Sequence, residues 1–158
     1  LKLGQFAAAL EKYEQALTYQ QTPEYAFWGH LNLARCHLAL GNAEAALTES
    51  RHALELEPKS PNCMKQLAWL LATIQNDQLR DGREALELIE QIKQNPKHVD
   101  VQWQEVHAAA LAEVGRFDEA IRASRRAVTA AKSIKSKRLP ELEAQLAKYQ
   151  ANQPWRLP

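Results

Sequence analysis

The sequence predicts an all-α fold, an α-solenoid of antiparallel helix pairs that ends in a capping helix. The first observation is an internal repeat, because three landmark positions recur together at steps of 37, 39 and 35 residues. These steps fit a unit of about 34 residues that carries small insertions. The second is that apolar residues in each unit are spaced by three and four, as on one stripe of a helix. The landmarks are Ala9, Ala46, Ala85 and Ala120; Tyr13, Ser50, Ile89 and Ser124; and Ala16, Ala53, Ile92 and Ala127.

The first unit is expected to be a half unit, residues 1–22, with a second helix only. That helix is predicted from Gln5 to Tyr19. Gly4 suits a tight turn before it, and Leu1 to Gly4 resemble the last turn of a helix whose start is missing. The chain is therefore interpreted as a piece of something longer.

The second unit, residues 27–60, is predicted to contain helices from Pro23 to Leu40 and from Ala43 to Leu56. Gly41 and Asn42 break the first helix, and Pro58 ends the second because its ring cannot continue the hydrogen-bond ladder.

The third unit, residues 61–100, departs from the period through a longer polar loop between its helices. Its first helix is expected from Asn62 to Ile74. Asp81 and Glu84 form a capping-box pattern before a second helix that runs to Asn95 and stops before Pro96.

The fourth unit spans residues 101–132, and a basic linker follows it. A helix over 139–150 carries Leu142, Leu146 and Tyr149 on one face, which suits a cap for the open edge of a solenoid. The tail, residues 151–158, is expected to lie against the cap or to be loose.

Composition excludes several classes of function. The 20 basic and 19 acidic residues leave a net charge of +1, which gives no overall attraction to nucleic acid or anionic membranes. No apolar run approaches the length of a membrane span. Cys36 and Cys63, the only cysteines, fall in apolar helical patterns and are expected to be buried thiols. Unpaired cysteines and the lack of a targeting segment favour the bacterial cytoplasm.

Leu33-Ala34 followed by Gly41, Ala46, Ala53 and Pro58 resembles the tetratricopeptide repeat, and residues 1–132 fit one half unit and three full units. The stretch Leu67 to Thr73 is similar to arrays common in large bacterial proteins. This resemblance implies a right-handed superhelix. The usual large aromatic residues of the family are absent, so the pairs are expected to pack more closely or less firmly; His30, Met64 and Gln104 replace those of the first helices, and Ser50, Ile89 and Ser124 those of the second.

The resemblance implies a protein-binding scaffold whose first helices line a concave groove for an extended or helical peptide. Arg35 and Lys65 supply cations there, but the set of residues that grips a terminal carboxylate in chaperone-binding members is not reproduced, so no carboxylate clamp is predicted. The groove positions carried over are Trp28, Leu31, Arg35 and Leu38; Asn62, Lys65 and Trp69; and Gln102, Glu105 and Ala109.

Two interpretations are open for the tryptophans of the groove positions. One is a peptide anchor, because an aromatic side chain in a pocket is a frequent anchor for a bound peptide. The other is a packing residue, and the two are equally favoured for Trp28. For Trp69 the favoured interpretation is that it fills space beside the longer loop. Trp103 and Trp155 are interpreted as packing residues.

No catalytic, cofactor or metal site is predicted. His30 and His37 lie two turns apart on one helix without a third ligand at the spacing that zinc sites use, and no phosphate loop or serine elbow is present. Basic residues gather near the end of the last unit, where a solvated helix is favoured over a nucleic-acid patch because no aromatic residues interleave with the charges. They are Arg122, Arg125, Arg126, Lys132, Lys135, Lys137 and Arg138.

The main functional hypothesis is therefore a non-enzymatic adaptor that binds a protein or peptide. Two alternatives remain: an accessory or regulatory domain of a larger enzyme, and a module that self-associates through its incomplete first unit.

Overall fold

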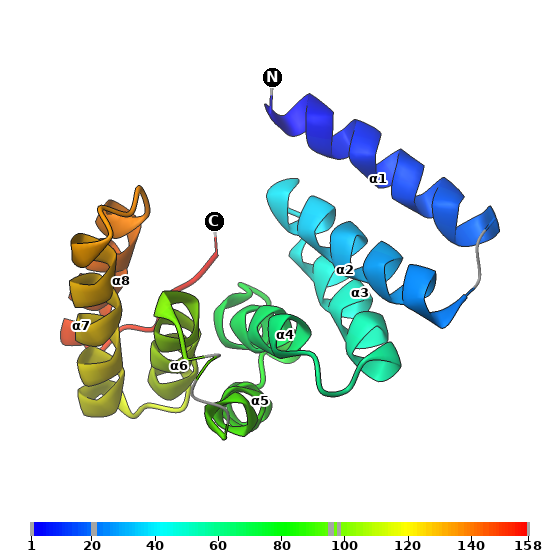
Figure 1. Cartoon of the computed structure of the whole chain (residues 1–158). Coiled ribbons are helices and arrows are strands. Elements are labelled where there is room, and N and C mark those ends of the chain that lie inside the picture. Colours follow the sequence, from blue (N-terminus) through cyan, green and yellow to red (C-terminus); the bar gives the residue numbers. More distant parts are fainter. Residues whose placement is uncertain (1, 20–21, 95–96, 98, 158) are drawn as a thin grey trace.

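The computed structural model describes residues 2–19, 22–94, 97 and 99–157. Leu1 of the first half unit, and Asn95 and Pro96 at the predicted end of a helix, lie outside these residues. The described residues form eight α-helices and one short 3-10 helix, arranged in an arc (Figure 1). The elements are α1 (Lys2–Tyr19), α2 (Pro23–Ala39), α3 (Ala43–Leu56), α4 (Pro61–Thr73), η1 (Asp77–Leu79), α5 (Gly82–Lys93), α6 (Val101–Glu113), α7 (Phe117–Ser133) and α8 (Leu139–Gln150).

Proline and glycine mark the helix boundaries. Pro23 and Pro61 stand in the first turns of α2 and α4, where the missing N–H has no helical partner to lose. Gly41 and Gly115 follow α2 and α6 with φ of +81° and +78°, a left-handed conformation that glycine adopts without steric cost. The chain therefore turns between the two helices of a pair at Gly41 and at Gly115.

The helices pack in sequential antiparallel pairs, α2 with α3, α4 with α5 and α6 with α7, and α4 also contacts α6. The main core cluster runs from α3 to α6. Small landmark residues bring each pair together, since Ala46, Ala85 and Ala120 are all fully buried. Ser50, which replaces a large aromatic residue, is also fully buried, and its hydroxyl donates to the carbonyl of Ala46 at 2.8 Å.

The first helix differs from its prediction. It begins at Lys2 and passes through Gly4, so Gly4 lies inside α1 and not in a turn. Gly29 lets α1 come close to α2, because it has no Cβ. A Cβ at this position would lie only 2.5 Å from Leu17 Cδ2 of α1.

The capping helix α8 buries Leu142 and Tyr149 as predicted, with Leu146 packed beside Leu142. The tail lies against this cap at Trp155, which packs on the cluster that contains Tyr149. It then continues to α4, where the Leu157 amide donates to the Thr73 carbonyl at 2.9 Å.

Candidate functional site

The first helices of the three pairs line one groove with a volume of 530 Å³. The α2 side chains stand at positions 28, 31, 35 and 38, so the spacing of three and four places them on one stripe. Arg138, Glu141 and the tail residue Leu157 complete the lining. The full set is Trp28, Leu31, Arg35, Leu38, Asn62, Gln66, Trp69, Gln102, Glu105, Val106, Arg138, Glu141 and Leu157.

Most of the predicted groove residues line this groove, but Lys65 and Ala109 do not. Lys65 is only 4% exposed, and its Nζ donates to Asp100 Oδ2 at 2.8 Å. Ala109 is buried in the main core. The prediction of Lys65 as a groove cation is therefore wrong, because its ammonium group is paired with Asp100 at the start of α6.

Glu105 reaches the groove with its carboxylate already paired. It is 3% exposed and accepts hydrogen bonds of 2.8 and 2.7 Å from Arg138 and of 2.8 Å from Gln145. The hydrogen bond to Glu105 raises the pKa of Arg138 above its ordinary value. The pair therefore shapes one wall of the groove and offers a ligand little net charge.

The two groove tryptophans differ in exposure. Trp28 is 52% exposed and meets Phe27 edge to face, with ring centroids 4.9 Å apart. Trp69 is half-buried against the main core, to which Leu79 of the longer loop also packs, and it still lines the groove. Packing and groove lining are thus combined at Trp69. Trp103 packs as predicted, and its Nε1 donates to the Ile89 carbonyl at 2.8 Å.

Three side-chain amides line the groove, from Asn62, Gln66 and Gln102. Gln66 Nε2 donates to Ser50 Oγ at 3.1 Å. Within the described part of the chain, the amides of Asn62 and Gln102 make no hydrogen bond. Each amide offers both donors and an acceptor, which is the complement of a peptide group.

The lining residues that sequence reasoning missed fall into two groups. Gln66 and Val106 are each one residue beyond a predicted position, so helical periodicity could have found them. Arg138 and Glu141 lie after the last unit. Leu157 reaches the groove through a bond between its carbonyl and Gln75 that spans 82 residues, and no local pattern signals such a contact.

Three of the basic residues near the end of the last unit have partners among other side chains. Lys132 pairs with Glu143 at 3.0 Å, Arg138 is bound to Glu105, and Arg126 donates to Gln104 at 3.0 Å. Arg122, Arg125 and Lys135 are exposed. The preference for a solvated helix over a nucleic-acid patch stays a prediction.

Comparison with known proteins gives one family and several distant relatives. The sequence profile of the tetratricopeptide repeat matches residues 2–133. "Photosystem I assembly protein Ycf3" of Synechococcus elongatus is 35% identical over 65 residues, which are 41% of this chain and 38% of that protein. The protein of the same name from Cyanophora paradoxa has the same identity and coverage. The chain thus spans under two fifths of the length of these relatives.

No solved structure gives a significant match to the chain. Among the described helices, none combines the length and the apolar character that crossing a bilayer needs. The repeat period, the sequential antiparallel helix pairs and the profile match agree over most of the chain, and the chain belongs to the tetratricopeptide repeat family.

Proposed function

We propose that this protein is a non-enzymatic scaffold that binds a peptide segment of a partner protein along its groove. Membership of the repeat family already implies protein–protein interaction. The observation that carries the finer proposal is the lining of the groove, which combines an exposed tryptophan with side-chain amides that have no partner among the described residues.

The lining indicates the chemistry of the ligand. An apolar or aromatic side chain of the peptide would contact Trp28 and Trp69, because the residues that contribute most to binding at protein interfaces are enriched in tryptophan and tyrosine. The amides of Asn62 and Gln102 would bind the peptide main chain. Arg35, an exposed cation of this lining, favours an acidic residue near the end of the groove formed by α2.

A displayed random-peptide library tests the groove directly. The groove variant is Trp28→Ala/Asn62→Ala, whose two positions are exposed and so leave the core intact. The matched control is Tyr19→Ala/Gln91→Ala, which removes an exposed aromatic of α1 and an exposed amide of α5, both outside the groove. Selected peptides should bind wild type and control equally and bind the groove variant at least about tenfold more weakly. Equal binding by all three chains, with unchanged circular dichroism, would show that the groove is not the binding surface.

The relatives favour a narrower version of this proposal. They are named as assembly proteins of photosystem I, so we propose that the partner is a subunit of a multiprotein complex during assembly. Cross-linking in cells through a photoreactive residue at position 28 should capture such a subunit.

The alternative of self-association has a physical motive in α1, which exposes Leu3 and Phe6. Light scattering at rising concentration separates the two, since a groove scaffold stays monomeric and a self-associating module gains mass.

A further inference from the structure

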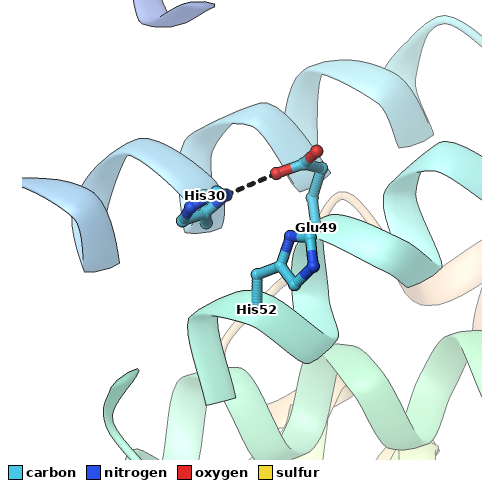
Figure 2. Close-up of side chains that lie close together, drawn as sticks. All are labelled: His30, Glu49 and His52. Carbon is cyan, nitrogen blue, oxygen red and sulfur yellow. Dashed lines mark hydrogen bonds and ion pairs between the residues drawn. The ribbon is translucent and has the colours of Figure 1, made fainter. Parts of the chain in front are cut away.

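A second cluster of chemically active side chains lies outside the groove. His30 of α2 and Glu49 and His52 of α3 place one ligand atom each within 4.8 Å of one another (Figure 2). None of the three lines the groove. Sequence reasoning tested His30 only against His37 on the same helix and missed the two side chains that the neighbouring helix provides.

The helix pair explains how the three side chains meet. Glu49 and His52 are three residues apart, so they share one face of α3, and that face lies against the α2 residue His30. His30 Nδ1 lies 2.6 Å from Glu49 Oε2, and the rings of His30 and His52 are 5.1 Å apart between centroids. An ionised carboxylate only accepts hydrogen bonds, so His30 Nδ1–H is the donor.

We propose that His30, Glu49 and His52 form a binding site for one divalent transition-metal ion of the zinc class. Two imidazoles and one carboxylate are a donor set that zinc sites use, with water or a substrate in the fourth position. Imidazole nitrogen also suits nickel, cobalt and copper, whereas magnesium and calcium prefer oxygen ligands. The two imidazole nitrogens therefore make the site unfavourable for magnesium and calcium.

The spacing needs only a small adjustment of side chains. Bonds of about 2.1 Å to a tetrahedral zinc ion place ligand atoms about 3.4 Å apart. The contact between His30 and Glu49 is shorter than this because a proton lies between the two atoms. The ion would take the place of that proton, which moves to Nε2 of the same ring, so the imidazole that binds the ion is neutral.

The position of the cluster indicates what occupancy would do. Side chains of His30 and Glu49 are 24% and 21% exposed, and His52 is exposed. The bound ion would join α2 to α3 and keep a coordination position open to water or to a donor from a partner protein.

Metal titration of the untagged chain tests the site, since a histidine tag would bind the same ions. Calorimetry should show Zn²⁺ binding with a stoichiometry of one. Bound Co²⁺ should give the visible absorption that is typical of cobalt with few ligands. Mg²⁺ should not bind. Zn²⁺ should also raise Tm, because it binds the folded chain.

The decisive comparison uses matched variants. Glu49→Gln and His52→Gln should each weaken Zn²⁺ binding at least about tenfold, while His37→Gln, a histidine change on α2 outside the cluster, leaves it unchanged. His52 is exposed, so its variant should fold. No uptake by wild type, or equal uptake by wild type and His52→Gln, would overturn the site and leave a hydrogen bond between two helices. Trp28→Ala/Asn62→Ala should bind Zn²⁺ normally, which keeps this test independent of the groove.

Discussion

Tyr149 is the largest side chain that the array buries completely, and its hydroxyl has no hydrogen-bond partner within the described residues. Burial raises the pKa of Tyr149 far above its ordinary value, so the hydroxyl stays neutral at all ordinary pH. A buried polar group without a partner costs stability. The ring therefore stabilises the cap while its oxygen opposes it.

Replacing the hydroxyl alone separates these two effects. Tyr149→Phe should leave the free energy of unfolding unchanged or raise it by up to about 1 kcal/mol. Tyr149→Ala should lower it by about 3–5 kcal/mol through the lost ring and the cavity. Urea unfolding measures both, and a clear loss in Tyr149→Phe would reveal a partner for the hydroxyl.

His107 makes the fold sensitive to acid. Burial, together with the charges of Lys93, Arg126 and Arg116, lowers the pKa of His107 to about 4. An unfolded chain binds this proton near pH 6.5, so between those two values the unfolded state holds more protons. The contribution of neutral His107 is therefore complete above about pH 6.5 and is lost as the pH falls toward 4.

The variant His107→Gln should remove this part of the pH dependence. We expect wild type to lose about 1–2 kcal/mol more than the variant between about pH 7 and about pH 4.5. Urea midpoints of the two chains at both pH values measure the difference. Parallel losses would assign the acid sensitivity to other groups.

The start of α6 depends on one carboxylate with two roles. Asp100 Oδ1 accepts the Trp103 amide at 2.7 Å and caps the helix, while Oδ2 binds the buried Lys65. The helix boundary and the burial of Lys65 are thus coupled.

A double-mutant cycle measures the coupling. Asp100→Ala should lower the free energy of unfolding by about 2–4 kcal/mol, because it removes a cap and leaves a buried cation unpaired. In a Lys65→Met background the same change should cost only about 1 kcal/mol, the cap alone. Equal costs in the two backgrounds, measured by urea unfolding, would show that Lys65 and Asp100 are not coupled.

Local signals predicted the elements well where they act within one helix. In the loop before α5, the local hydrogen bonds were predicted and the contacts with other helices were not. Asp81 caps α5 as predicted, accepting from the amides of Arg83 and Glu84. The second hydrogen bond of a capping box, from the Asp81 amide to the Glu84 carboxylate, is not formed. Glu84 binds Arg51 of α3 at 2.7 Å, and the Asp81 amide donates to the Leu71 carbonyl at 3.1 Å. Partners from other helices replaced the local one.

The candidate sites show the same division. Periodicity places Trp28, Leu31 and Arg35 on one stripe, so most of the groove could be predicted. Lys65 could not, because its burial depends on a carboxylate 35 residues later. The meeting of His30 with Glu49 and His52 likewise requires the packing of α2 on α3, which a search along one helix cannot reveal.

Across the whole molecule, stability is expected to be uneven. None of the side chains described in α1 is buried, whereas α4 and α6 supply most of the main core. Segments with few buried contacts open at low free energy. Hydrogen exchange read by mass spectrometry should therefore show α1 exchanging first and α4 and α6 last. Protection of α1 equal to that of α4 would contradict this order.

The tail adds a connection that the repeat plan does not require. Leu157 is bonded to Thr73 and Gln75, and Arg156 forms an ion pair with Glu113 at 2.7 Å. The chain therefore closes on itself from the end of α4 to residue 157, with α5 to α8 inside the closed segment. A pulling force applied at the tail would load α4 first, and α8 would feel it only after these bonds had broken. In mechanical terms the last helices are shielded by their own chain.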